Sequence, residues 1–304
     1  MPAAVDTTSP PLGPAHWLAW LGIVAMALLA RLPWSWQQAL GRALGALLRM
    51  ALRERRGVAE RNLALCFPEL DPGARGRLLD AHFAAIGIGV FEFARSWWGS
   101  VKPLRRGLVV EGLDHLEAAR AGGRGVIVVS GHFTTLEVCG RLMCDHVPLA
   151  GMYRPHGQAA MEWAVRRGRA RYAAAMFRKQ DVRGAVRHLK RGGLLWYAPD
   201  QDPSRGDSVY VPFFGQPAHS LTSTHQLARM SGAAVLLFKH SRRDDGGYTL
   251  SLQPALDDFP SADAAADTAR IMAGIEAMAR AAPAQYLWIH RRFKRQPDGS
   301  SAYP

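Results

Sequence analysis

Cysteine is scarce in this chain of 304 residues, and no two cysteines form a C-x-x-C pair. The three cysteines are Cys66, Cys139 and Cys144, which is an odd number. This pattern excludes a disulfide scaffold and a zinc ribbon as the basis of the fold, and it suits a reducing compartment.

Acidic residues are few relative to basic ones. The chain has 25 aspartates and glutamates against 38 lysines and arginines, which gives a formal net charge of +13, and 33 of the basic residues are arginine. So much positive charge predicts a polyanionic partner: nucleic acid, an anionic membrane surface, a phosphorylated substrate or an acidic carrier protein.

Formal charge is absent between Asp6 and Arg31, and residues 17–30 read WLAWLGIVAMALLA. This run is shorter than the roughly 20 residues that a membrane-spanning helix needs, although its apolar flanks extend it. Tryptophans lie towards both ends, as in the aromatic belt of a membrane protein. No basic segment precedes the run and no A-x-A site ends it, so a secretory signal is not predicted. We predict that residues 1–36 form a membrane anchor, spanning or half-inserted; the alternative is a buried core helix.

Arginine dominates the segment that follows. Residues 31–61 hold seven arginines and two glutamates, and their apolar residues recur at helical spacing. This pattern predicts a basic amphipathic helix on anionic headgroups, with an ordinary surface helix as the alternative. The same arginines place everything after the anchor on the cytoplasmic side by the positive-inside rule.

The rest of the chain predicts an α/β fold. Residues 37–107 are expected to be helical and close to the membrane, with a break at CFPELDPG (66–73). Short apolar runs then alternate with helical patterns through residues 108–304, which indicates a mostly parallel sheet flanked by helices. The expected strands are 108–112, 125–130, 194–199, 233–240, an exposed or edge strand at 248–254, and an aromatic-apolar strand within 285–295. The expected helices are 113–121, 135–145, 158–175, 181–191, 221–231 and 262–281. We predict one catalytic domain, residues 37–304, behind the anchor.

The segment GVIVVSGHFTTLEVCGRLM (125–143) holds the first candidate for catalysis. A buried strand leads into a loop with His132, and Glu137 falls in the first turns of the next helix. If the carboxylate folds back to the imidazole, the pair has the parts of a general base and its orienting partner. A structural histidine beside the helix N-terminus is the alternative.

Two other loops carry polar side chains suited to substrate binding. Arg154 lies in MYRPHG (152–157), and its planar guanidinium suits bidentate capture of a phosphate, with a local salt bridge as the alternative. Asp200, Gln201 and Asp202 follow the strand at 194–199, and an apolar VPFFG turn comes shortly after.

These segments, taken in order, resemble the late acyltransferases of lipid A biosynthesis, the lauroyl and myristoyl transferase family of Gram-negative bacteria. The matching motifs are NLALCFPEL, GHFTTLE, YRP, PDQD with VPFFG, LARMSGAAV and QYLWIHRRFK. The resemblance implies a glycerolipid-acyltransferase-like fold, whose signature is a histidine, four residues, then an acid. It implies that His132 is the general base and Glu137 its partner, and that Arg154, Asp200, Gln201 and Asp202 bind or support the substrate.

The resemblance also implies a reaction. A fatty acyl group would pass from acyl carrier protein to a hydroxyl of a Kdo-bearing lipid A precursor, an anionic glycolipid, with no metal or organic cofactor. Backbone amides around Gly131–Thr134, or Arg154, would stabilise the oxyanion. The protein would work at the cytoplasmic face of the cell inner membrane, in contact with its phospholipids. A lysophospholipid or an ornithine lipid is the alternative acceptor, and no nucleic-acid partner is expected, because the chain has no recognisable binding module.

Two features depart from the family or are left open by it. Family members often have Ala-Thr where this chain has His219-Ser220, and Tyr-Gly where it has Pro203-Ser204, which leaves acceptor specificity open. The basic run from Arg166 to Arg191 is either a solvated helical face or a docking surface for carrier protein or headgroups.

Overall fold

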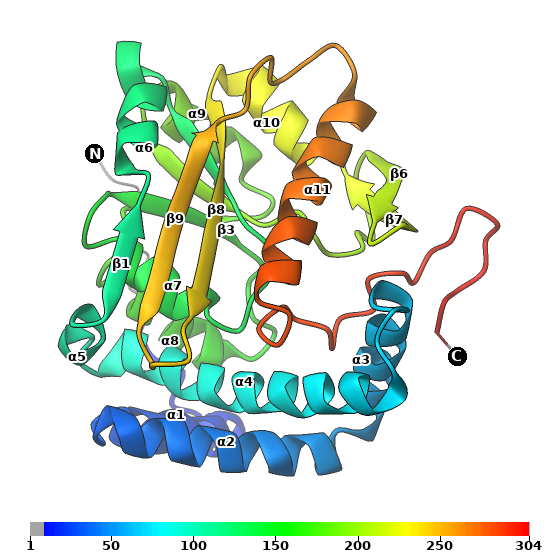
Figure 1. Cartoon of the computed structure of the whole chain (residues 1–304). Helices are drawn as coiled ribbons and strands as arrows, with labels where there is room; N and C mark the ends of the chain where they lie inside the picture. Colours follow the sequence, from blue (N-terminus) through cyan, green and yellow to red (C-terminus); the bar gives the residue numbers. More distant parts are fainter. Residues whose placement is uncertain (1–8, 304) are drawn as a thin grey trace.

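The computed structural model describes residues 9–303, and its centre is a seven-stranded sheet with helices against both faces (Figure 1). Its strands are β1 (Leu108–Glu111), β2 (Val126–Val129), β3 (Leu149–Tyr153), β4 (Met176–Arg178), β5 (Leu194–Tyr197), β8 (Ala234–Arg242) and β9 (Tyr248–Ala255). They lie in the order β1-β9-β8-β2-β5-β3-β4, and every neighbouring pair is parallel except β8 with β9. The predicted α/β fold with a mostly parallel sheet is confirmed.

Two hydrophobic cores lie on the two faces of the sheet. The flanking helices are α6 (Leu113–Arg120), α7 (Leu136–Met143), α9 (Val182–Lys190), α10 (Ser223–Ser231) and α11 (Ala264–Ala281). In the fully buried central strand β2, Val126 and Val128 belong to the core shared with α6 and α7. Ile127 and Val129 belong to the core shared with α9, α10 and α11. A strand buried on both faces needs such a continuous apolar sequence, which is why GVIVVS predicts it.

Three expectations about strands need correction. The strand expected at an edge, β9, lies inside the sheet between β1 and β8. The VPFFG turn joins two strands that were not expected, β6 (Ser208–Phe213) and β7 (Gln216–Leu221), which form a separate antiparallel hairpin. Residues 285–295 form no strand and have only an isolated bridge, from Tyr286 to Phe133. The side-chain amide of Asn62 donates hydrogen bonds to the carbonyls of Trp288 and His290, so these carbonyls do not pair with a strand.

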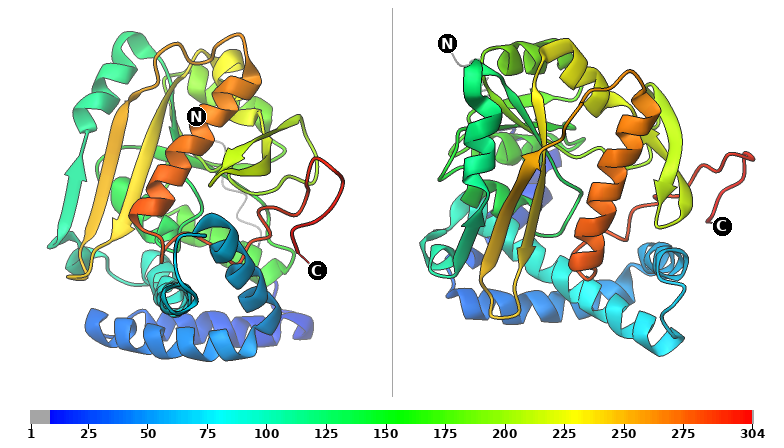
Figure 2. Two further views of the ribbon diagram at one scale, coloured as in Figure 1. Left: turned by 45° about the vertical axis from the view of Figure 1, so that its right-hand side comes forward. Right: turned by 45° about the horizontal axis from the view of Figure 1, so that its top comes forward.

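A layer of helices covers one end of the sheet (Figures 1 and 2). It contains α1 (Trp17–Leu29), α2 (Trp34–Ala51), α3 (Arg53–Cys66) and α4 (Pro72–Trp98), with α5 (Lys102–Arg105) leading into β1. Helices α2 and α4 touch through glycine, because a Cβ on Gly87 would collide with the backbone of Gly41 and Gly45. The domain boundary that we placed at residue 36 therefore falls inside a helix that is packed on the rest of the chain.

The prediction of a membrane-spanning anchor is not supported. Helix α1 has 13 residues, and no helix within residues 9–303 combines the length and apolar character needed to cross a bilayer. The first eight residues of the predicted anchor segment lie outside the described part of the chain. Ile23 of α1 is buried in a cluster with Trp97 of α4, whereas Leu18, Leu21 and Val24 are exposed.

Candidate active site

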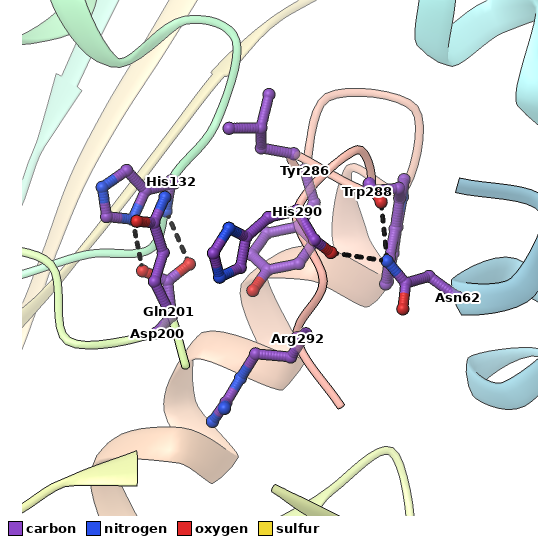
Figure 3. Close-up of a pocket in the computed structure, with 9 residues that line it drawn as sticks. Asn62, His132, Asp200, Gln201, Tyr286, Trp288, His290 and Arg292 are labelled. Carbon is purple, nitrogen blue, oxygen red and sulfur yellow. Dashed lines mark hydrogen bonds and ion pairs between the residues drawn. The ribbon is translucent and has the colours of Figure 1, made fainter. Parts of the chain in front are cut away.

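His132 and Asp200 meet at one edge of the sheet. His132 follows β2, Asp200 follows β5, and these strands are parallel neighbours, so the loops after them lie side by side. Oδ1 of Asp200 is 2.5 Å from Nδ1 of His132, and Oδ2 accepts the backbone N–H of His132 at 2.8 Å (Figure 3). The carboxylate thus fixes both the ring and the backbone of His132, and it leaves Nε2 as the ring nitrogen that can take a proton from a substrate.

Burial and charge act against each other in this pair. Burial disfavours ionisation of Asp200, but the charge and hydrogen bonds of His132 outweigh it and lower the pKa of Asp200 to about 2. Burial also disfavours the imidazolium, yet the Asp200 carboxylate outweighs this and raises the pKa of His132 above its ordinary 6.5. Nε2 of His132 therefore becomes a free base only as the pH rises through that raised pKa.

The partner that the sequence predicts for His132, Glu137, is bound elsewhere. Glu137 is only 4% exposed and lies in the first turn of α7. Its Oε2 accepts from Nη2 of Arg169 at 2.6 Å, and its Oε1 accepts from Nε1 of Trp97 at 2.6 Å and from the hydroxyl of Tyr172. Within residues 9–303 no hydrogen bond or ion pair joins Glu137 to His132, so the expected pairing is replaced by His132 with Asp200.

Glu137 does not pair with His132 because other hydrogen-bond donors surround its carboxylate. Burial opposes ionisation of Glu137, but the charge of Arg169 and the hydrogen bonds from Arg169, Tyr172 and Trp97 outweigh it, so the pKa of Glu137 is lowered. Arg169 ends α8 (Ala159–Arg169), and Trp97 lies in the last turn of α4, so Glu137 ties three helices together. Arg169 belongs to the run that we expected to be a solvated face or a docking surface, yet its side chain is only 17% exposed.

A cavity of about 1050 Å³ opens beside His132. Apolar side chains from several elements line it, among them Ile23, Met26, Ile86, Phe93, Leu136 and Trp196. This volume is slightly above the range of about 300–1,000 Å³ that is usual for ligand pockets. A large apolar cavity with a histidine–carboxylate pair at its wall suits a long aliphatic chain whose reacting end reaches His132.

The other predicted site residues lie at the same cavity but in different settings. Arg154 is exposed, lines the cavity, and forms no hydrogen bond or ion pair with the part of the chain that the structure describes. Gln201 is half-buried and lines the cavity beside His132. The Asp202 carboxylate has protein partners instead: Nδ1 of His219 at 3.1 Å and Nε of Arg295 at 3.9 Å.

Two of the backbone amides expected to stabilise an oxyanion already donate to protein acceptors. The amide of His132 donates to Asp200, and that of Thr134 donates to the carbonyl of Gln285 at 2.8 Å. These two N–H groups are therefore already bound to protein acceptors and are not free to stabilise an oxyanion.

The C-terminal segment supplies residues that local sequence patterns do not assign to the site. The side chain of Tyr286, which is 4% exposed, helps to lower the pKa of Asp200. Nε2 of His290 accepts the backbone N–H of Asp202 at 3.2 Å, and burial lowers the pKa of His290 to about 4, which keeps the ring neutral. Figure 3 shows His290 between the Asp200–Gln201 loop and Asn62. The one signal for these residues is the motif QYLWIHRRFK, which contains both.

Comparison with known proteins gives a consistent result. Residues 10–295 match the model of the family described as bacterial lipid A biosynthesis acyltransferase. The chain is 39% identical over 295 residues to lipid A biosynthesis palmitoleoyltransferase of Escherichia coli K12, covering 96% of this chain and 95% of that protein. It is 37% identical over 290 residues to the lauroyltransferase of the same organism, covering 95% of each. A solved structure, the 1-acyl-sn-glycerophosphate acyltransferase PlsC of Thermotoga maritima, aligns over 84% of this chain and 99% of that one, with 14% identity and a TM-score of 0.38.

An α/β sheet with a histidine–carboxylate pair at the wall of a large apolar cavity suits an enzyme that transfers acyl groups. The chain belongs to the bacterial lipid A biosynthesis acyltransferase family. It is accordingly an O-acyltransferase, and the resemblance seen in its motifs is confirmed.

Proposed function

We propose that this protein transfers a fatty acyl group from acyl carrier protein to a hydroxyl of a Kdo-bearing lipid A precursor, a late step of lipid A biosynthesis. The observation that carries the proposal is the His132–Asp200 pair at the wall of the 1050 Å³ apolar cavity. The family match and the printed names of the relatives, palmitoleoyl-, lauroyl- and myristoyltransferases of lipid A biosynthesis, support the transfer of a fatty acyl group and a lipid A-type acceptor.

In the proposed mechanism Nε2 of His132 takes the proton of the acceptor hydroxyl. The resulting alkoxide attacks the thioester carbonyl, and the thiolate leaves and takes the proton back from His132. Asp200 holds the ring by Nδ1 and stabilises the imidazolium while it exists. The Glu137–Arg169 pair also lines the cavity, and we assign it the task of holding α4, α7 and α8 around the acyl chain.

Exposed basic side chains at the cavity fit an anionic acceptor. Arg154 and Lys179 both line it, and Arg154 keeps its guanidinium fork unpaired within residues 9–303. A guanidinium binds a phosphate or carboxylate with two parallel hydrogen bonds. We therefore assign Arg154 to the anionic part of the acceptor.

The acyl cavity is tested by narrowing it. Gly140 of α7 lines the cavity, and a Cβ built on it meets no atom within 4 Å, so a larger side chain there enters open space. Gly140→Leu should lower kcat/KM for the longest acyl-carrier-protein donor that the enzyme accepts by about tenfold or more, with less effect on shorter donors. The expectation rests on roughly 0.8 kcal/mol per methylene that loses its place in the cavity.

The control for this test is Gly57→Leu, which adds the same side chain at an exposed glycine of α3 with nothing within 4 Å. Donors are compared with a Kdo-bearing lipid A precursor, a lysophospholipid and an ornithine lipid as acceptors, and products are measured by mass spectrometry. Equal loss for all chain lengths would show that the cavity does not hold the acyl chain, and transfer to either of the other acceptors alone would overturn the proposed acceptor.

We also propose that the protein works on the cytoplasmic face of the inner membrane by lying in the surface of the bilayer. Eleven of the fifteen exposed large hydrophobic side chains in the described chain lie between residues 12 and 52, on or next to α1 and α2. Leu18 of α1 is 84% exposed. These helices form the outermost layer of one end of the molecule (Figure 2). An exposed apolar layer with nearby arginines fits the interface of an anionic bilayer, and the cavity lined by α1 would then open close to the lipids.

Membrane binding is measured by flotation with vesicles of phosphatidylethanolamine and phosphatidylglycerol. The double variant Leu18→Glu/Leu21→Glu should bind at least about tenfold more weakly, since each buried leucine contributes roughly 1.5–3 kcal/mol. Val109→Glu, which adds one such negative charge at an exposed position of β1, should bind like the wild type. Undiminished flotation of the double variant would place the membrane contact elsewhere.

A further inference from the structure

Asp202, in the loop after β5, is part of a second hydrogen-bonded chain that includes His219 and Ser208 of the β6–β7 hairpin. Oδ1 of Asp202 lies 3.1 Å from Nδ1 of His219. The other ring nitrogen, Nε2 of His219, lies 2.7 Å from Oγ of Ser208. A serine, a histidine and an aspartate in this order of contact are the parts of an activated nucleophile with its base and orienting acid.

The chemistry of the groups fixes the direction of these hydrogen bonds. A carboxylate only accepts, so Nδ1 of His219 carries the hydrogen that Asp202 binds, and Nε2 has the lone pair. The Ser208 hydroxyl must then donate to Nε2, as a nucleophile donates to its base. The guanidinium of Arg295 competes for Nδ1, but it lies at 3.4 Å and its side chain is 39% exposed. The Asp202 carboxylate is nearer and only 4% exposed, so it decides the tautomer.

Ser208 can be reached from outside and lies next to the large cavity. In the hairpin Ser208 pairs with Leu221, and Tyr210 pairs with His219, so these side chains share one face. Leu221 lines the large cavity, and Ser208 and His219 are both half-buried. Ser208 and His219 are therefore partly open to solvent, and their face of the hairpin adjoins the cavity at Leu221.

We propose that Ser208, His219 and Asp202 form a second site, of the serine-hydrolase type, that hydrolyses activated carboxylic esters. Oγ of Ser208 bonds to the carbonyl carbon while its proton passes to Nε2 of His219. The bond to the leaving alcohol breaks, and that alcohol takes the proton. Water, deprotonated by the same nitrogen, then attacks the acyl-serine, releases the carboxylic acid and returns the proton to Ser208. The site does not use His132, so it stands or falls independently of the proposed acyl transfer.

The experiment uses full-length His132→Ala protein, in which the base of the proposed acyl transfer is missing. It is treated with a fluorophosphonate, the adduct is located by peptide mass spectrometry, and hydrolysis of 4-nitrophenyl butyrate is followed by absorbance. We expect one adduct, on Ser208, and ester hydrolysis that persists without His132. Adding His219→Ala should slow both reactions at least about 100-fold, the effect of removing a general base. Adding Ser300→Ala, at an exposed serine near the C-terminus, should change neither.

Two results would overturn the proposal. One is an adduct on a different serine, or none, in protein whose hairpin sequence is unaltered. The other is labelling of Ser208 at an unchanged rate when His219 is replaced, since this would show an exposed serine without a base. The mapping needs no change at Ser208, so misfolding of a Ser208→Ala variant does not decide the result.

Discussion

Replacing His132 with alanine should lower kcat for acyl transfer at least about 100-fold, because the acceptor hydroxyl then has no positioned base. The free energy of unfolding should also fall, by about 2–3 kcal/mol, because the Asp200 side chain is 1% exposed and loses the partner that keeps it ionised. Turnover is measured with an acyl-carrier-protein donor and a Kdo-bearing lipid A precursor, and stability by urea unfolding. Turnover is compared per folded enzyme, and full activity of folded His132→Ala would remove His132 from the chemistry.

The pH profile separates a base from a residue that only shapes the site. The Asp200 carboxylate raises the pKa of His132 above 6.5, so the rising limb of kcat/KM should lie above pH 6.5 in the wild type. In Asp200→Asn the carboxylate no longer raises the pKa of His132, and burial favours the neutral ring. The rising limb of kcat/KM should therefore move to lower pH, while the plateau value of kcat/KM falls. A limb that stays in place in Asp200→Asn would mean that another group titrates.

Much of the fold follows from local patterns. The strand β2 and helix α7 around His132 could be predicted, because a continuous Val-Ile run and an amphipathic helix are both visible within a few residues. The segment 285–295 contains the apolar run YLWI but forms no strand, since the carbonyls of Trp288 and His290 bind Asn62 from α3. That contact joins parts of the chain more than 200 residues apart and leaves no trace in either local sequence.

The active site shows the same division. The sequence places His132 and Asp200 separately at the ends of strands, but their pairing depends on β2 and β5 being neighbours in the sheet. The spacing of His132 and Glu137 instead favours the wrong carboxylate, because spacing does not show that Arg169, Trp97 and Tyr172 surround Glu137. Proximity along the chain suggests that His132 pairs with Glu137. In the tertiary structure His132 pairs with Asp200, and Glu137 pairs with Arg169.

The second large effect is expected when Glu137 is replaced, and it concerns the free energy of unfolding. Glu137→Ala leaves the guanidinium of Arg169 buried without its carboxylate, which should lower the free energy of unfolding by about 3–5 kcal/mol. The matched control is Asp80→Ala, which breaks an exposed ion pair with Arg49 and should cost less than about 1 kcal/mol. Replacing both partners, as Glu137→Leu/Arg169→Met, should recover only part of the loss: the apolar pair carries no uncompensated charge, but the N–H of Trp97 and the hydroxyl of Tyr172 lose their acceptor. Each variant is measured by urea unfolding at neutral pH.

The pH dependence of this stability gives an independent readout. Glu137 has a pKa below its ordinary 4.5, so its contribution is complete above pH 4.5 and is lost as the pH falls through the lowered value. The stability difference between wild type and Glu137→Ala should therefore shrink on acidification. The opposite hypothesis is that Glu137 acts directly on His132. It predicts that Glu137→Ala unfolds like the wild type but turns over at least about 100-fold more slowly. That result would restore Glu137 to the chemistry and leave the Arg169 contact as a secondary feature.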